Sequence, residues 1–201
     1  MKLYTAPGTC SIACTIALHE AGVEHTLIKT DISAHKTATG EDFYAINPKG
    51  SVPALDIGGG EVLTEGVAIQ QFVADSAPQA GLVPEQGTME RARMHEAMHF
   101  IGSGLHVAYA PLFYMKDPDE KAKQLALVDK KLGWLEGRLS DGREWLAGAS
   151  FTLADSYMLA ISNFSAYFGH SLAAFPKLEA LRARVMARPA VQAAIAAEKA
   201  L

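Results

Sequence analysis

The sequence changes its pattern at a segment rich in proline and glycine, residues 78–84, and this change constrains the fold most strongly. Before the segment, short apolar runs typical of strands alternate with runs of helical periodicity, whereas only helical patterns follow it. The net charge also changes there, from −5 over the first 80 residues to +1 over the remainder. We therefore expect two differently built domains, residues 1–77 and 88–201, joined by a linker at 78–87.

The first domain reads as a mixed α/β unit with the order βαβ followed by ββα. Three consecutive glycines mark the turn of a short hairpin, and Gly22 marks the end of the first helix. The expected elements are a strand at 2–5, a helix at 11–21, a strand at 25–30, an irregular stretch with some helical character at 33–45, hairpin strands at 53–57 and 61–64, and a helix at 67–76.

The second domain reads as all-helical. Thr152-Leu153-Ala154-Asp155 is a variant of the capping box, with Asp in place of the usual Glu, and it predicts a helix start. Proline favours helix starts because its missing N–H has no helical partner there. The stretch from Thr88 to about Met115 is expected to form one long helix or two stacked ones. Further helices are expected from Pro118 to about Leu139, from Thr152 to about Phe168, and from near Pro176 and Pro189.

Composition limits the function classes. A net charge of −4 argues against general nucleic-acid binding. No apolar run approaches the roughly 18 residues that span a membrane, and the first residues lack the apolar stretch of a secretory signal. Two cysteines do not form a disulfide framework. We therefore expect a cytoplasmic protein with free thiols and no membrane partner.

Cys10 follows a short turn and opens the first expected helix. Unpaired N–H groups and the helix dipole stabilise a thiolate at such a position, so we expect a pKa below the ordinary value of about 8.5. A small buried hydrophobic residue is the alternative. Cys14 lies one turn further on, and its C-x₃-C spacing indicates packing against the sheet rather than a second redox thiol.

Two other stretches suggest a peptide ligand. Val52-Pro53 begins a strand; if this bond is cis, the Val52 backbone turns outward to pair with an extended peptide, although trans is the commoner state. The segment Leu63-Thr64-Glu65-Gly66 begins a helix, where N–H groups hold a carboxylate and Glu65 holds an ammonium. With Cys10, these features describe a short peptide with a thiol and an α-amino-acid end, which fits glutathione.

The chain resembles the bacterial glutathione S-transferases, specifically the beta class, over its whole length. That resemblance implies a thioredoxin-like N-terminal domain for glutathione, an all-helical C-terminal domain for the electrophile, and a homodimer. The motifs that carry it are Pro7-Gly8-Thr9-Cys10-Ser11, Asn47-Pro48-Lys49-Gly50, Val52-Pro53-Ala54-Leu55, Leu63-Thr64-Glu65-Gly66-Val67-Ala68-Ile69 and Phe151-Thr152-Leu153-Ala154-Asp155.

The resemblance also implies a set of glutathione contacts, with Cys10 and His106 near the sulfur as catalytic residues. Ser103 would reach the glutathione of the neighbouring subunit. The implied set is Cys10, His35, Val52, Pro53, Glu65, Gly66, His99, Ser103 and His106. The family often has Lys near position 35, Asn at 99 and Lys at 107, where this chain has His35, His99 and Val107. We therefore expect weaker or more pH-sensitive glutathione binding.

The implied reaction joins the glutathione thiolate to electrophilic small molecules, as in detoxification, with glutathione as co-substrate and no other cofactor or metal. Whether the Cys10 sulfur attacks or only supports the bound thiol stays open. The alternatives are a non-catalytic glutathione- or ligand-binding protein and a monothiol disulfide reductase of the same fold. Aromatic residues on helices are more often core, but we expect an electrophile pocket among Tyr109, Phe113, Tyr114, Tyr157 and Phe164.

One motif suggests a different class of protein, a zinc protease. His95-Glu96-Ala97-Met98-His99 matches the zinc-protease pattern H-E-x-x-H. His106 comes one residue later than the extended pattern requires, and one residue turns a helix by about 100°. We therefore expect no metal site and place these histidines on a helix face at a pocket or dimer cleft.

Overall fold

The computed structural model describes all residues, 1–201, in two compact units. The first consists of Met1–Val83 together with Ala187–Leu201, and the second consists of Pro84–Met186. The C-terminal segment was expected to belong to the helical domain, and the structure instead assigns it to the first unit. No helix has both the length and the apolar character needed to cross a membrane.

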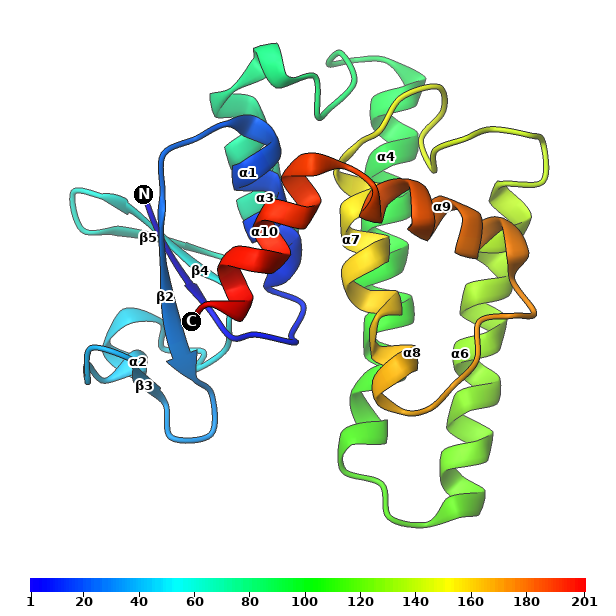
Figure 1. Cartoon of the computed structure of the whole chain (residues 1–201), viewed down its shortest axis with the longest axis horizontal. Coiled ribbons are helices and arrows are strands. Elements are labelled where there is room, and N and C mark those ends of the chain that lie inside the picture. Colours follow the sequence, from blue (N-terminus) through cyan, green and yellow to red (C-terminus); the bar gives the residue numbers. More distant parts are fainter. The chain divides into compact units, whose positions relative to one another are not determined.

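A five-stranded sheet forms the centre of the first unit (Figure 1). The strands lie in the order β3-β2-β1-β4-β5, with β1 parallel to β2 and antiparallel to β4. Their bounds are β1 Lys2–Thr5, β2 Thr26–Asp31, β3 Lys36–Thr37, β4 Ala54–Gly58 and β5 Glu61–Thr64. The predicted strands and the hairpin are confirmed.

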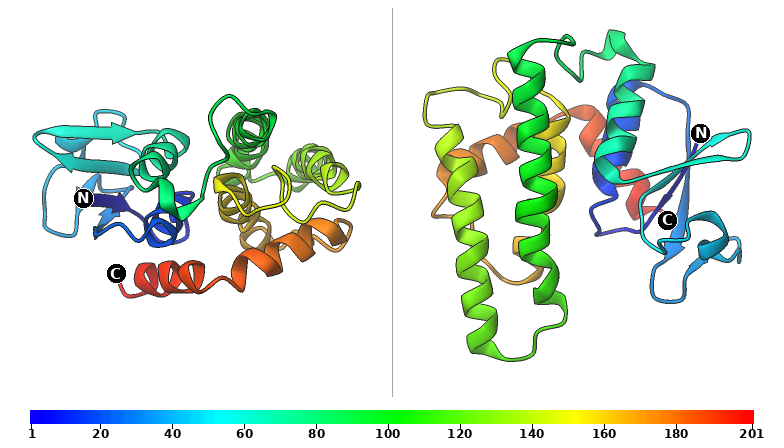
Figure 2. Two further views of the ribbon diagram at one scale, coloured as in Figure 1. Left: turned by 90° about the horizontal axis from the view of Figure 1, so that it is seen from above. Right: turned by 180° about the vertical axis from the view of Figure 1, so that it is seen from behind.

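Two helices cover one face of this sheet. α1 (Ile12–Ala21) packs against α3 (Gly66–Ser76), as the views in Figures 1 and 2 show. Gly22 ends α1 in the left-handed conformation, with φ of 64°, and its N–H bonds to the last carbonyls of the helix. The stretch at 33–45 was expected to be irregular with some helical character, and it holds the unpredicted strand β3 and the start of a one-turn helix, α2 (Phe43–Ile46).

The last helix, α10 (Pro189–Lys199), packs on α1 and explains why the C-terminal segment belongs to this unit. Glu198 is 4% exposed and accepts hydrogen bonds from the hydroxyls of Thr5, at 2.8 Å, and Thr15, at 2.7 Å. At the other end of α10, the Arg188 guanidinium contacts both oxygens of Glu20 at 2.5 and 2.7 Å. These polar contacts join segments more than 160 residues apart.

The second unit is helical, as predicted. The expected helix from Thr88 to Met115 begins as α4 (Met89–Phe100), passes through a π-helical turn (Ile101–His106) and continues in α5 (Val107–Tyr109) and a 3₁₀ turn (Ala110–Phe113). The other helices are α6 (Pro118–Arg138), α7 (Leu153–Ser162), α8 (Phe164–Tyr167) and α9 (Pro176–Met186). Figure 2 shows the long helices α4 and α6 running alongside each other.

α7 is buried along its whole length, and its start has the predicted capping box. The Asp155 carboxylate accepts the N–H groups of Thr152 and Leu146, both at 2.8 Å. A completely buried carboxylate is tolerated only when such bonds satisfy it. Asp155 therefore fixes the start of α7 and the preceding loop together.

Replacing Glu198 tests how the C-terminal helix is held. Glu198→Ala leaves the Thr5 and Thr15 hydroxyls without their acceptor, and we expect the free energy of unfolding to fall by about 1–3 kcal/mol. Glu198→Gln keeps an acceptor oxygen and loses less. Urea unfolding of both variants measures these changes.

The difference in stability between wild type and Glu198→Gln should also depend on pH, in a direction that follows from the pKa of Glu198. Burial raises the pKa of Glu198 above its ordinary 4.5, so the folded protein holds a proton that the unfolded chain has released. Wild-type stability therefore falls relative to Glu198→Gln as the pH rises above about 4.5. Glu24→Gln, on an exposed site, serves as the control. An equal difference between wild type and Glu198→Gln at pH 5 and pH 8 would contradict this assignment.

Candidate functional site

The loop that carries Cys10 is held by three hydroxyl groups. Ser11 Oγ lies 2.6 Å from Thr5 Oγ1 and 2.7 Å from Thr9 Oγ1. Thr9 Oγ1 also donates to the Ala6 carbonyl at 2.8 Å. Since Thr5 donates to Glu198 as well, the hydroxyl chain connects this loop to the buried carboxylate of α10.

The Cys10 thiol lies half-buried just before α1, with Sγ 4.0 Å from the Val52 carbonyl oxygen. Burial raises the pKa of Cys10 to about 11, and the carboxylates of Glu198 and Glu65 contribute in the same direction. The expectation of a lowered pKa is therefore wrong. The helix terminus favours the thiolate, but loss of solvent outweighs it.

Cys14 is fully buried, as expected, and Sγ donates to the Gly66 carbonyl at 3.5 Å. This contact is with the start of α3. Cys14 therefore ties the two helices on the sheet together, and both cysteines are free thiols.

The segment before β4 is organised by one buried amide. Asn47 is 1% exposed; its Nδ2 donates to the Ser51 carbonyl at 2.7 Å, and its Oδ1 accepts the Lys49 N–H at 3.1 Å. The segment leads into Val52-Pro53, whose peptide bond is cis. The Val52 side chain is half-buried and the Pro53 side chain is buried.

Glu65 lies at the turn between β5 and α3 with φ of 72°, a conformation that costs a non-glycine residue about 1–3 kcal/mol. Its carboxylate is exposed and pairs with Lys49 Nζ at 2.6 Å, and Lys49 also donates to Thr64 Oγ1 at 3.0 Å. The first hydrogen bond of α3 goes from Ile69 N–H to the Glu65 carbonyl. The N–H groups of Gly66 and Val67 therefore point out of the helix end without helical partners.

His35 and Tyr44 form a second polar pair in the first unit, besides Lys49 and Glu65. The His35 Nε2 lies 3.1 Å from the Tyr44 hydroxyl, the two rings pack at 4.3 Å, and the buried Nδ1 of His35 has no hydrogen-bond partner. Gly50 lies against this pair with φ of 66°, and a Cβ there would come within 2.5 Å of Tyr44 Cε1. Only glycine fits that position.

The predicted glutathione residues of the helical unit have different surroundings. His99 and Ser103 are both exposed, and the Ser103 hydroxyl donates to the His99 carbonyl at 2.8 Å. His106 is half-buried, its ring lies 5.7 Å from that of Phe164, and burial lowers its pKa below 6.5. Val107 is 60% exposed.

The predicted electrophile residues differ in burial. Tyr109 is fully buried and its hydroxyl bonds to Ser165, which makes it a core residue. Tyr157 and Phe164 are also buried, whereas Phe113 and Tyr114 are exposed. Phe113 packs edge-on against Phe164, with ring centres 5.4 Å apart.

Two side chains of the H-E-x-x-H motif, His95 and Glu96, are engaged in other contacts. Arg91 Nε donates to His95 Nε2 at 3.2 Å. The Glu96 carboxylate pairs with Arg93 at 3.0 Å and Arg138 at 2.9 Å, and these contacts hold its pKa below the ordinary range. No three His, Cys, Asp or Glu side chains gather in a possible metal-binding group.

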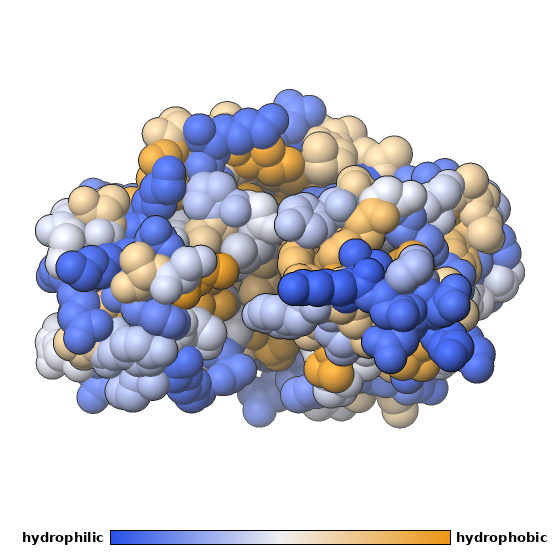
Figure 3. Space-filling model, turned by 90° about the horizontal axis from the view of Figure 1, so that it is seen from below, coloured by the Kyte–Doolittle hydropathy of each residue, from blue (hydrophilic) through white to orange (hydrophobic).

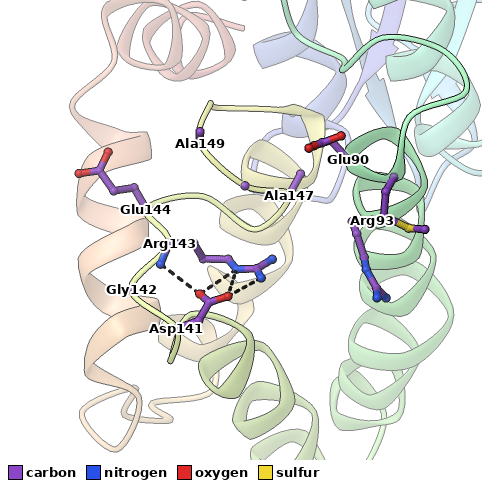
Figure 4. A pocket seen from close by; sticks show the side chains of 10 residues that line it. Glu90, Arg93, Asp141, Gly142, Arg143, Glu144, Ala147 and Ala149 are labelled. Carbon is purple, nitrogen blue, oxygen red and sulfur yellow. Dashed lines mark hydrogen bonds and ion pairs between the residues drawn. The ribbon is translucent and has the colours of Figure 1, made fainter.

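The helical unit also has a surface hollow of about 760 Å³ between the start of α4 and the loop after α6 (Figure 4). Arg143 and Asp141 form a paired group in it, at 2.5–3.0 Å, while Glu90 and Arg93 face it from α4. None of the predicted site residues lines this hollow.

Two residues with a clear role at the first-unit site were not assigned one from the sequence. Asn47 and Lys49 belong to a motif that the resemblance used, but their contacts with Ser51 and Glu65 appear only in the folded chain. The motif Asn-Pro-Lys-Gly was the available signal, since Asn and Gly together are typical of an ordered turn.

Comparison with known proteins gives two family matches. Residues 1–75 match the model described as glutathione S-transferase, N-terminal domain, and residues 98–189 match glutathione S-transferase, C-terminal domain. Among curated proteins, the chain is 37% identical to glutathione S-transferase GstA of Escherichia coli O157:H7 over 199 residues, which cover 98% of each chain.

Solved structures agree with this result. A sphingomonad glutathione S-transferase complexed with glutathione has 40% identity and a TM-score of 0.94, with 100% of each chain covered. A beta-class glutathione S-transferase of Sphingomonas chungbukensis has 40% identity and a TM-score of 0.93, again with complete coverage of both chains.

The raised pKa of Cys10 predicts slow alkylation at neutral pH. Because the thiolate is the reactive form, its modification by iodoacetamide should rise about tenfold per pH unit from pH 7 to pH 9, without levelling off. Mass spectrometry of the ligand-free protein measures the rate, and the buried Cys14 serves as an internal control. A rate that reaches its plateau below pH 8 would show a lowered pKa instead.

Proposed function

Because this chain belongs to the glutathione S-transferase family, it is a transferase with glutathione as a substrate, and we propose that its first unit holds that glutathione at three places. These are the Cys10 loop, the Val52 backbone and the start of α3. The observation that carries the proposal is the approach of Cys10 Sγ to the Val52 carbonyl, at 4.0 Å, in the unit that also presents free N–H groups at α3.

The γ-glutamyl end fits the start of α3. Its carboxylate would accept the outward N–H groups of Gly66 and Val67, where the helix dipole favours an anion. Its ammonium would pair with Glu65, which Lys49 holds in place in the ligand-free protein. The strained backbone of Glu65 supports a role in binding, since such strain concentrates at functional sites.

The cysteinyl part would pair with the Val52 backbone beside Pro53, which places the glutathione sulfur near Cys10. The glycine carboxylate would lie toward His35, whose buried Nδ1 has no partner. The resemblance implies that the family often has a lysine near this position, and here a histidine ring would make the contact. The expectation of weaker or more pH-sensitive glutathione binding therefore remains part of the proposal.

We assign Cys10 the role of a hydrogen-bond donor rather than a nucleophile. With a pKa of about 11, the thiol stays protonated at neutral pH and its S–H can stabilise the thiolate of bound glutathione. That thiolate then forms the C–S bond with the electrophilic carbon, and the leaving group departs with the electrons of its own bond. The same protonation disfavours the alternative of a disulfide reductase acting through Cys10.

The other predicted contacts stay proposals. His106 would act near the sulfur, as a neutral imidazole because burial lowers its pKa. His99 would contact glutathione, and Ser103 would contact that of the second subunit of a homodimer. The helical domain would take a hydrophobic electrophile, with Phe113, Tyr114, Tyr157 and Phe164 as candidates of the predicted set, whereas the buried Tyr109 belongs to the core. A cytoplasmic location also stays a prediction.

Replacing Glu65 tests the site of the γ-glutamyl end. Glu65→Gln keeps the length of the side chain and removes the charge that pairs with the ammonium. We expect KM for glutathione to rise about tenfold or more, since a hydrogen bond to a charged group contributes about 1.5–3 kcal/mol. Glu61→Gln, in the adjacent strand β5, is the matched control. Equal KM values for the two variants would rule out this contact.

Two replacements separate the roles of Cys10. If its S–H supports the glutathione thiolate, Cys10→Ser keeps a donor and most of the conjugation rate with 1-chloro-2,4-dinitrobenzene, while Cys10→Ala loses about tenfold in kcat/KM. Cys14→Ala serves as the control cysteine variant. Two results together would instead identify the Cys10 sulfur as the reacting group. These are complete loss of conjugation in both Cys10 variants and a Cys10–glutathione disulfide in the mass spectrum of the wild-type protein.

A further inference from the structure

The Lys49 side chain is held at the end of strand β5 by a turn that precedes β4. The Asn47 Oδ1 accepts the Lys49 N–H at 3.1 Å, and the Gly50 N–H donates to the Asn47 carbonyl at 2.8 Å. Because Ala54 at the start of β4 pairs with Thr64 at the end of β5, the chain before β4 lies beside this strand end. Lys49 Nζ donates to Thr64 Oγ1 at 3.0 Å. Both the turn and the strand therefore fix the position of the ammonium.

The ion pair of Lys49 and Glu65 leaves one hydrogen-bonding group free on each partner. Lys49 Nζ lies 2.6 Å from Glu65 Oε1, and together with the bond to Thr64 this contact uses two of the three ammonium protons. The second carboxylate oxygen, Glu65 Oε2, has no partner. The two side chains are 54% and 70% exposed, so a ligand can reach both. The pair therefore offers one N–H donor and one acceptor oxygen next to each other.

A zwitterion is the ligand that complements such a pair. An α-amino acid carries its ammonium and its carboxylate on the same carbon, so the two charges can face an ion pair in the opposite order. A ligand with only one charge would gain one attraction and suffer one repulsion. The face of the first unit at the left of Figure 3 is mostly hydrophilic, which also suits a charged ligand better than an apolar one.

We propose that Lys49 binds the α-carboxylate of the γ-glutamyl residue of glutathione, while Glu65 binds its ammonium. The inference rests on the position proposed above for the γ-glutamyl end, at the start of α3. One carboxylate oxygen accepts the free proton of Lys49 Nζ, and the other accepts the outward N–H groups of Gly66 and Val67. Lys49 was not among the predicted glutathione contacts, and this role makes it a residue that determines specificity for an α-amino-acid end.

Two other roles of Lys49 have different consequences. If Lys49 only positions Glu65, its removal weakens every ligand that carries the ammonium. If Lys49 competes with the ligand for Glu65, its removal strengthens the same ligands. In both cases the effect follows the ammonium of the ligand, whereas the proposed contact follows the carboxylate. Ligands that carry only one of the two charges therefore distinguish the three roles.

Three S-methyl tripeptides test the proposal. S-Methylglutathione has both charges, its glutaryl analogue lacks the amino group and keeps the carboxylate, and its γ-aminobutyryl analogue lacks the carboxylate and keeps the ammonium. The methyl group prevents ionisation of the thiol from entering the measurement. Titration calorimetry gives the dissociation constants for wild type, Lys49→Met, Lys49→Arg and Glu65→Gln. Lys29→Met is the control, because it removes an exposed charge from β2 of the same unit.

We expect Lys49→Met to weaken S-methylglutathione and the glutaryl analogue about fivefold or more, and to leave the γ-aminobutyryl analogue within about twofold. Lys49→Arg keeps a cation and should retain most of the affinity, and Lys29→Met should change none of the three. Unchanged binding of the glutaryl analogue by Lys49→Met would overturn the proposal. An equal or larger change for the γ-aminobutyryl analogue would do the same, since the effect would then follow the ammonium.

Glu65→Gln separates this inference from the proposal on which it rests. It should weaken S-methylglutathione and the γ-aminobutyryl analogue without weakening the glutaryl analogue. If Glu65→Gln changes none of the three affinities, the proposed position of the γ-glutamyl end is wrong, and the role of Lys49 is overturned with it. If Glu65→Gln behaves as expected and Lys49→Met does not, only the role of Lys49 is overturned.

Discussion

The buried carboxylate of Glu198 is the interaction on which the first unit depends most. It comes from the last helix, yet its two hydrogen bonds go to Thr5 at the end of β1 and Thr15 inside α1. Through Thr5 the bonds continue to Ser11 and Thr9, which shape the Cys10 loop. Burying a carboxylate costs free energy unless its hydrogen bonds are made. The position of Glu198 therefore requires that β1, α1 and α10 pack so that both hydroxyls reach its carboxylate.

That arrangement also sets the chemistry of Cys10. The thiol lies close to a helix start, but its burial raises its pKa, and the carboxylates of Glu198 and Glu65 act in the same direction. In the site that we propose, glutathione would meet a neutral S–H donor, backbone groups and helix N–H groups. Glu65 and Lys49 supply full charges of opposite sign and pair with each other in the ligand-free protein. The hydrogen-bond donors of such a site would chiefly stabilise the charges of bound glutathione.

The helical unit has a fully buried helix at its centre. α7 is buried throughout and is fixed at its start by Asp155, so it serves as the rigid centre of the unit. Phe113 and Tyr167 pack against each other, with ring centres 5.3 Å apart, and both keep part of their apolar surface exposed.

The sequence by itself determined the features that depend on neighbours within about four residues. β1, α1 with its end at Gly22, the hairpin, and the capping box of Thr152 and Asp155 were all predicted, because local periodicity and caps specify them. The motifs also identified the family and placed Cys10, Val52 and Glu65 in one candidate site.

Only the tertiary structure decided the rest. The start of α10 near Pro189 was predicted, but its packing on α1 depends on Glu198 meeting two hydroxyls more than 180 residues away. The pKa of Cys10 depends on burial, which reverses the effect expected from the local helix start. The contact of Lys49 with Glu65 and the core position of Tyr109 likewise arise from distant segments. Desolvation and long-range pairing are properties of the packed chain, and no local pattern encodes them.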